Sequence, residues 1–340
     1  MNPAEWLIRT AQRLPEAPAL LQGETLVASY RQFAGRAARI AGSLVARGVR
    51  RGDRVAIFMK NSTDYLEAMY GAWWAGAAAV PINAKLHPKE AAWIVEDAGA
   101  EIVFISGDAG DALRAVMPSC VREAIASGSP AFERLRAGEA LTSPVPILRD
   151  EMVWLFYTSG TTGKPKGVTI SAGNIEAMSF SYFIDVDEVR RDDAILYAAP
   201  MSHGAGLYNF MHVLRGARHA VPESGGFDPA EIAATAPRIG NISMFAAPTM
   251  VRRLVDRVKA EGGTGEGIRT VVYGGGPMYL TDIIDAVDVM GPKFVQIYGQ
   301  GESPMTITAL SRDLVAGRAH PRWRERLASV GTAHSCVRLR

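Results

Sequence analysis

The stretch Trp154-Leu-Phe-Tyr-Thr-Ser-Gly-Thr-Thr-Gly-Lys-Pro-Lys-Gly-Val168 carries the strongest signal in the sequence. The apolar run from Met152 to Tyr157 predicts a buried strand. It leads into residues that are all threonine, serine or glycine, and then into lysines around a proline: Thr158, Ser159, Gly160, Thr161, Thr162, Gly163, Lys164, Pro165 and Lys166. Backbone N–H groups and hydroxyls in such a loop can converge on one anion, and the lysines add positive charge. We therefore expect a phosphate-binding loop.

This loop differs from the P-loop of kinases and GTPases. Gly160 and Gly163 enclose only two residues, and Pro165 stands where the P-loop has its metal-binding hydroxyl. The spacing therefore argues against a kinase or GTPase. Ser171 is a plausible N-cap for a helix that runs to about Phe183. The alternative to a phosphate-binding loop is a polar loop with no binding role that connects the strand to this helix.

Composition narrows the class of protein. With 340 residues, 48% of them hydrophobic and 21% charged, the chain can bury a large core and form more than one subdomain. A net charge of +2 without a dense basic run argues against nucleic acid as a partner. Two cysteines are too few for a disulfide framework. The sequence shows no signal peptide, and its longest apolar stretch, Ala68 to Pro81, is too short to span a bilayer, so we expect a cytoplasmic protein without an integral membrane segment.

Strands and helices alternate through both halves of the chain, which predicts mostly parallel sheets flanked by helices. An N-terminal helix, a hairpin around Gly23 and an amphipathic helix from Tyr30 to Gly48 come first. The following elements alternate as strand and helix: Arg54–Met59, Thr63–Ala75, Ala78–Asn83, Pro88–Ala98 and Glu101–Ser106. Residues 109–146 carry weaker patterns. We expect a first α/β subdomain over residues 1–150 and a second over 151–328.

The second half of the chain repeats the alternation of strands and helices. The strands are Ala194–Ala198, Ala217–Val221, Ile242–Ala246, Thr270–Tyr273 and Phe294–Tyr298. The helices Pro229–Thr235 and Pro248–Glu261 separate some of them, and another starts near Leu207. Ligands of open α/β sheets gather at the carboxyl ends of strands. Four candidate loops should therefore meet at one crevice, those that follow the predicted strands ending at Tyr157, Ala198, Tyr273 and Tyr298.

Besides the phosphate-binding loop, two of these loops carry residues suited to a nucleotide, and one carries a histidine. Gly274-Gly275-Gly276-Pro277 allows close backbone approach to a flat ligand, with a plain tight turn as the alternative. In Tyr298-Gly299-Gln300-Gly301-Glu302, the tyrosine suits stacking on a base and the carboxylate suits a hard cation, or else marks the start of a helix. His203 follows another strand, and such a histidine is more often a packing or hydrogen-bonding residue than a catalyst.

The segment from Tyr157 to Val168 closely resembles the signature of the adenylate-forming (AMP-binding) superfamily, which includes acyl-CoA synthetases, luciferases and the adenylation domains of peptide synthetases. Gly274–Pro277 resembles that family's Gly-Gly-X-Pro loop, and Tyr298–Glu302 resembles its Tyr-Gly-X-Thr-Glu motif. Phe245-Ala-Ala-Pro-Thr249 resembles one wall of its acyl pocket, with strand-end packing as the alternative. His203 resembles the position beside the substrate carboxylate, where it would position or gate the acid.

The resemblance implies an acid–thiol ligase that uses ATP, Mg²⁺ and coenzyme A. The carboxylic acid attacks the α-phosphate of ATP, giving an acyl-adenylate and pyrophosphate, and the thiol then displaces AMP. The catalytic residues it implies are Lys166, Glu302 and His203. The nucleotide-binding residues are Thr158–Lys164, Gly274–Pro277, Tyr298, Gly299 and Gln300, and Glu302 and Thr161 would hold magnesium. Gly301 departs from the pattern because it lacks the threonine hydroxyl, which Ser303 or Gln300 would have to replace.

Several alternatives stay open at the level of sequence. Val337–Arg340 alternates like a strand, and residues 329–340 resemble the start of a further β region. The resemblance implies that the family's small C-terminal domain is absent, so that this large N-terminal domain alone has little activity. A non-catalytic nucleotide- or acyl-binding protein and an adenylation domain that loads a carrier protein are the competing functions. The sequence leaves open whether the acid is fatty or aromatic and whether the chain forms a homodimer.

Overall fold

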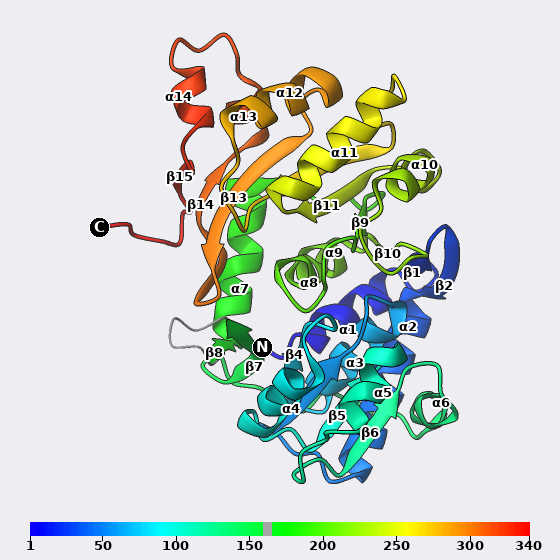
Figure 1. Cartoon of the computed structure of the whole chain (residues 1–340). Coiled ribbons are helices and arrows are strands. Elements are labelled where there is room, and N and C mark those ends of the chain that lie inside the picture. Colours follow the sequence, from blue (N-terminus) through cyan, green and yellow to red (C-terminus); the bar gives the residue numbers. More distant parts are fainter. Residues whose placement is uncertain (159–164) are drawn as a thin grey trace. The chain divides into compact units, whose positions relative to one another are not determined.

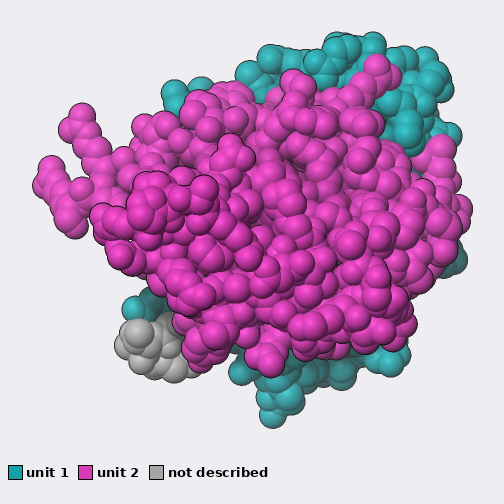
Figure 2. Space-filling view, turned by 90° about the horizontal axis from the view of Figure 1, so that it is seen from above, with its two compact units in different colours: residues 1–20, 27–175, 200–203 teal, residues 21–26, 176–199, 204–340 magenta. Residues whose placement is uncertain are grey.

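The computed structural model describes residues 1–158 and 165–340, whose helices and strands are labelled in Figure 1. The chain divides into two compact units. The first comprises Met1–Leu20, Val27–Ile175 and Pro200–His203, and the second comprises Leu21–Leu26, Glu176–Ala199 and Gly204–Arg340 (Figure 2).

A six-stranded sheet forms the centre of the first unit, with the strand order β6-β5-β3-β4-β7-β8. Its strands are β3 (Arg54–Phe58), β4 (Ala78–Pro81), β5 (Ile102–Ile105), β6 (Glu123–Ala126), β7 (Met152–Thr158) and β8 (Lys166–Ser171). All neighbours pair in parallel except β7 and β8, which are antiparallel. Strand β7 pairs with β4 through Ala79 and Trp154, so it belongs to this first sheet.

The helices of the first unit start at clear sequence signals. They are α1 (Ala4–Arg13), α2 (Tyr30–Ala46), α3 (Thr63–Trp74), α4 (Pro88–Asp97), α5 (Gly107–Arg114) and α6 (Pro130–Ala137). Ser29 and Gln32 form a capping box at the start of α2, which confirms the predicted amphipathic helix. Helix α3 is buried on all sides, and Trp73 donates from its indole nitrogen to the Val153 carbonyl at 2.7 Å. The apolar composition of α3 therefore reflects its place in the core.

Residues 109–146 contain more regular structure than the sequence indicates. Strand β6 extends the sheet beyond β5, and α5 and α6 flank it in the chain. Helices α5 and α6 contain few apolar residues. An ion pair anchors α6, because Arg136 donates to the buried carboxylate of Glu67 at 2.6 Å. Such long-range ion pairing leaves no periodic pattern in a sequence.

A nine-stranded sheet has the order β15-β14-β13-β12-β11-β9-β10-β1-β2, and its strands β9 to β15 lie in the second unit. Its strands are β1 (Pro18–Gln22), β2 (Thr25–Ser29), β9 (Ala194–Leu196), β10 (Arg218–Val221), β11 (Ile242–Ala246), β12 (Ile268–Tyr273), β13 (Phe294–Gln300), β14 (Ser303–Leu310) and β15 (Thr332–Ala333). Strands β10, β9, β11, β12 and β13 pair in parallel, and β14 is antiparallel to both neighbours. The predicted α/β class with mostly parallel sheets flanked by helices is confirmed.

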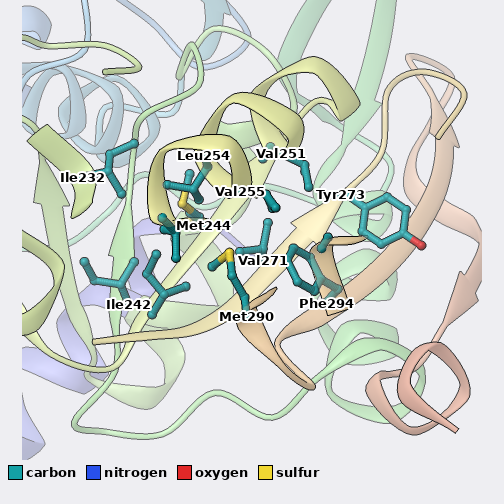
Figure 3. Packing of buried hydrophobic residues seen from close by; sticks show 14 of the residues in the cluster. Ile232, Ile242, Met244, Val251, Leu254, Val255, Val271, Tyr273, Met290 and Phe294 are labelled. Atoms are coloured by element: carbon teal, nitrogen blue, oxygen red, sulfur yellow. The ribbon is translucent and has the colours of Figure 1, made fainter. Parts of the chain in front are cut away.

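The core of the second unit packs helices against these parallel strands. Its helices are α8 (Gly204–Leu207), α9 (Asn209–Arg215), α10 (Pro229–Ile239), α11 (Pro248–Ala260), α12 (Leu280–Met290), α13 (Arg312–Ala316) and α14 (Trp323–Leu327). Met244 of β11 and Val271 of β12 lie among side chains of α11 and Met290 of α12 (Figure 3). This packing fixes the carboxyl ends of β11, β12 and β13, where the candidate loops begin.

Two predicted elements need correction. The helix expected from Ser171 to Phe183 is α7 (Ala172–Ser181), and Ser171 does cap it, but a π-helix, η1 (Tyr182–Val186), follows directly. The strand expected over Val337–Arg340 is wrong, because those residues carry no strand pairing and the short β15 lies earlier in the chain. Ser335 is instead held by two hydrogen bonds to the Asp185 carboxylate, at 2.9 and 2.6 Å.

Candidate active site

The predicted phosphate-binding loop connects two antiparallel strands rather than a strand and a helix. Thr158, the last residue of β7, lies opposite Lys166, the first residue of β8. The side chain of Lys166 is exposed. Ser159, Gly160, Thr161, Thr162, Gly163 and Lys164 lie outside the described residues. The hairpin therefore holds both ends of the predicted loop at adjacent positions of one sheet.

Tyr157, at the start of the signature, is tied to the first unit by its side chain. Its hydroxyl donates to Asp97 Oδ2 at 2.7 Å, and its ring packs edge-on against Trp93 with centroids 6.2 Å apart. Burial and the Asp97 carboxylate raise the pKa of Tyr157. Since the hydroxyl is a donor committed to Asp97, Tyr157 serves to fix β7 against α4.

His203 lies in the first unit, near the end of β7. Its ring meets that of Phe156 edge-on at 5.5 Å, and the hydroxyl of Ser202 lies 3.0 Å from its Nδ1. The backbone N–H of Met201 donates to the buried side chain of Asn61 at 2.8 Å, which anchors the segment. His203 remains exposed, and the neighbours that partly cover it lower the pKa of the imidazole by desolvation. A neutral imidazole at neutral pH suits a positioning role.

The second unit carries a pocket of about 430 Å³ at the ends of β12 and β13. Three segments line it: Gly275–Met278 after β12, Gln296–Gly299 within β13, and Leu327–Val330 after α14. Two of the three predicted nucleotide loops thus border one pocket, as their positions after neighbouring parallel strands require.

The glycines of the loop after β12 are required by close contact and by backbone geometry. A Cβ on Gly274 would lie 2.6 Å from the carbonyl oxygen of Ile297 on β13. Gly275 has a φ of +78°, which L side chains rarely adopt. Gly275, Gly276 and Pro277 are exposed and present backbone at the pocket. A bare backbone surface of this kind suits one face of a planar ligand.

On the other side of the pocket, Tyr298 is partly exposed, with 37% of its surface accessible. Gln300 donates from Nε2 to the Tyr298 hydroxyl at 3.0 Å, and Ser303 and Thr306 share a hydrogen bond between their hydroxyls at 3.3 Å. Gln300 and Ser303, which could replace the hydroxyl missing at Gly301, thus each form a hydrogen bond within the β13–β14 hairpin. Glu302 is exposed in the turn between β13 and β14.

Gln296 is a pocket residue that the sequence did not single out. It lines the pocket from β13, is buried, and its Oε1 has no hydrogen-bond partner among the described residues. A buried amide oxygen without a partner is rare and calls for an explanation such as a bound ligand. The signal in the sequence is only its place two residues before Tyr298.

Across residues 1–158 and 165–340, no group of three or more His, Cys, Asp and Glu side chains is placed to hold a metal ion. Glu302 is a single carboxylate, and Thr161 lies outside the described residues. A hard cation at Glu302 would therefore need oxygen ligands from a bound phosphate. Within the same ranges, no helix combines the length and apolar character needed to cross a membrane.

Comparison with known proteins agrees with this geometry. The profile of the AMP-binding enzyme family matches residues 7–340. A feruloyl-CoA synthase from Amycolatopsis sp is 30% identical over 313 residues, which is 92% of this chain and 62% of that protein. The long-chain-fatty-acid–CoA ligase FadD13 of Mycobacterium tuberculosis is 36% identical over 209 residues, 59% of this chain and 41% of the ligase.

Among solved structures, the N-terminal domain of FACL13 from Mycobacterium tuberculosis matches with a TM-score of 0.86 and 26% identity, covering 98% of this chain and 83% of that one. The chain thus spans less than two thirds of the length of these curated relatives and 83% of the matched N-terminal domain. The family match accounts for the two α/β units, the signature around β7 and the pocket at β12 and β13. The chain belongs to the AMP-binding enzyme family.

Proposed function

We propose that this chain binds ATP and a carboxylic acid and forms an acyl-adenylate, the first step of an AMP-forming acid–thiol ligase. The observation that carries this proposal is the pocket between the Gly275–Met278 segment and Tyr298, which has the size and the flat walls suited to a purine base. The similarity to proteins named as a CoA synthase and a CoA ligase supports acid activation as the reaction.

In the proposed complex, adenine lies between the backbone of Gly275 and Gly276 and the ring of Tyr298, where it buries aromatic surface. The Oε1 of Gln296 accepts a hydrogen bond from the exocyclic amine of the base, which satisfies an otherwise unpartnered buried oxygen. Guanine presents a carbonyl at that position, so this contact favours ATP over GTP.

The phosphates are assigned to the signature segment. Thr158, Lys166 and the segment from Ser159 to Lys164 would hold the β- and γ-phosphates, and Glu302 would hold Mg²⁺ together with phosphate oxygens. A carboxylate oxygen of the acid attacks the α-phosphorus, the bond from that phosphorus to the bridging oxygen breaks, and pyrophosphate leaves. The role of these residues is to position the reactants and neutralise charge. His203 would orient the acid.

A thiol completes the proposed reaction. Its sulfur attacks the acyl carbonyl, its proton passes to solvent or a base, and AMP leaves with its phosphate oxygen. Coenzyme A is the proposed acceptor because the curated relatives named above include CoA ligases. A carrier-protein thiol is the alternative acceptor, and a protein that binds nucleotide without catalysis is the alternative function.

Calorimetric titration tests the adenylate site directly. Wild type is titrated with MgATP, MgGTP and an acyl-sulfamoyl adenosine, a stable mimic of the adenylate. We expect ATP to bind more tightly than GTP, the mimic to bind more tightly than either, and Tyr298→Ala to weaken both adenine ligands. Tyr279→Ala is the matched control, because Tyr279 is 73% exposed on the same loop and does not line the pocket. Absence of binding by wild type, or equal loss in both variants, would contradict the proposal.

Assays of product formation distinguish an enzyme from a protein that only binds nucleotide. Production of pyrophosphate with an acid and ATP would exclude a purely nucleotide-binding role. Comparison of coenzyme A with a phosphopantetheine-bearing carrier protein as acceptor would then identify the thiol.

A further inference from the structure

One wall of the pocket, formed by Leu327–Val330, lies mostly outside the hydrophobic core. Leu327 is buried in that core, whereas Ala328, Ser329 and Val330 are exposed. The Ser329 hydroxyl donates to the Arg326 carbonyl at 2.7 Å, a contact within the same turn of the chain. Burial therefore fixes the Leu327 end of this wall, and the Val330 end depends on a restraint from elsewhere in the second unit.

Thr308 of β14 provides a restraint at the Val330 end. Its side chain is buried, and its hydroxyl donates to the Val330 carbonyl oxygen. A little further along the chain, Ala333 of β15 pairs with Thr308 in antiparallel register. The segment that leaves the pocket wall is thus held at Thr308 twice, by a side-chain hydrogen bond and by strand pairing.

The same threonine is the partner of Tyr298 in the antiparallel pairing of β13 and β14. Side chains of directly opposed residues lie next to each other on one face of a sheet. Tyr298 and Val330 both line the pocket, whereas Thr308 does not. Thr308 therefore connects two pocket walls, to Tyr298 through the strand pairing and to Val330 through its hydroxyl.

We propose that Thr308 is a positioning residue of the nucleotide site, whose hydroxyl holds Val330 at a fixed separation from Tyr298 and so prepares the pocket for a purine base. This inference rests on the proposed adenylate-forming function. A pocket whose walls are fixed before binding loses less conformational entropy when the ligand enters, and this raises its affinity. Thr308 touches no ligand in this arrangement and acts through the backbone of Val330.

The test compares two substitutions of Thr308 by calorimetric titration with MgATP. Thr308→Val keeps the β-branched shape and removes the hydroxyl, so ATP should bind about three- to tenfold more weakly, the range expected for one hydrogen bond. Thr308→Ser keeps the hydroxyl and should bind ATP like wild type. A threonine needed only for packing would give the reverse result, because valine retains both branches of the side chain and serine loses one.

Thr235→Val is the matched control. The Thr235 hydroxyl on α10 also donates to a backbone carbonyl, that of Glu231 at 2.8 Å, but it does not line or contact the pocket walls. This variant should keep the wild-type affinity for ATP. The inference is overturned if Thr308→Val binds ATP as tightly as wild type, if Thr308→Ser binds as weakly as Thr308→Val, or if Thr235→Val loses as much affinity.

Hydrogen exchange on the ligand-free protein tests the restraint without a nucleotide. The backbone amides of residues 328–333 should exchange faster in Thr308→Val than in wild type or Thr308→Ser, because the wall opens more often once its hydrogen bond is lost. Equal exchange in all three proteins would overturn the inference while leaving the proposed function intact. If wild type shows this restraint but binds no ATP, the proposed function itself is wrong and the role in a nucleotide site falls with it.

Discussion

Gly274 and Ile297 approach each other so closely that a Cβ on the glycine would lie 2.6 Å from the Ile297 carbonyl oxygen. The contact joins the end of β12 to β13 beside the pocket. Real Cβ atoms essentially never come this near to a backbone oxygen. The separation of the two pocket walls therefore depends on the absence of a side chain at position 274.

We expect Gly274→Ala to push the ends of β12 and β13 apart. Overpacking of this kind costs about 1–3 kcal/mol in the free energy of unfolding, and the altered pocket should bind ATP more weakly. Chemical denaturation and ATP titration measure both effects. Gly226→Ala is the control, because a Cβ there would meet nothing within 4 Å and the residue does not line the pocket. Equal behaviour of the two variants would contradict the argument.

Replacing Gln296 by leucine should weaken ATP binding without weakening the fold. The substitution removes a buried oxygen that lacks a partner among the described residues, so the free energy of unfolding should stay equal or rise. If Oε1 accepts a hydrogen bond from the adenine amine, the affinity of the variant for ATP should fall by about three- to tenfold. Its preference for ATP over GTP should also decrease. Retention of full discrimination between ATP and GTP would exclude this role for Gln296.

The buried histidines of the second unit should make the protein sensitive to mild acid. Burial lowers the pKa of His212 to about 4, and burial together with the neighbouring His212 lowers the pKa of His219. In the unfolded chain a histidine has a pKa of about 6.5, so the unfolded state binds more protons between these values. Stability is therefore complete above about pH 6.5 and falls as the pH decreases toward 4.

The contribution of His212 alone should amount to about 2 kcal/mol lost between pH 7 and pH 5. Urea unfolding at the two pH values measures this loss. His212→Gln should reduce the difference between the two pH values, whereas His320→Gln, which replaces a histidine outside the core, should leave it unchanged. A wild-type protein equally stable at both values would refute the prediction.

Asp187 is expected to be a strong determinant of stability in the second unit. Its Oδ2 accepts from Arg312 at 2.9 Å and from the Thr270 hydroxyl at 2.6 Å, and the carboxylate is nearly buried. Removing one partner of such a pair leaves an uncompensated charge, so Asp187→Ala should cost about 3–5 kcal/mol. Arg190→Ala is the comparison, because its pair with Glu188 is more than half exposed and should contribute less than about 1 kcal/mol. The prediction is checked by measuring the free energy of unfolding of both variants, and it is wrong if Asp187→Ala costs no more than Arg190→Ala.

Local signals in the sequence were sufficient for much of the α/β pattern. Caps such as Ser29, apolar runs such as Met152–Tyr157 and the glycines after β12 act through the backbone of a few neighbouring residues, so they can be recognised without the fold. Strand order explains why Gly275 and Tyr298 line the same pocket: β12 and β13 pair in parallel, and the carboxyl ends of parallel strands share one edge of a sheet.

The tertiary structure alone decided the features that depend on distant pairing and burial. Pairing of Ala79 with Trp154 places β7 in the first sheet, and the antiparallel partner β8 turns the signature into a hairpin. The significance of Gln296 lies in a pocket-lining amide oxygen that is buried without a partner among the described residues, and burial is set by residues far away in the chain. The family signature and the alternation of strands and helices are local patterns, so both can be recognised in the sequence without the fold. Which side chains line the pocket follows only from how the elements pack, because strands and helices distant in the chain form its walls.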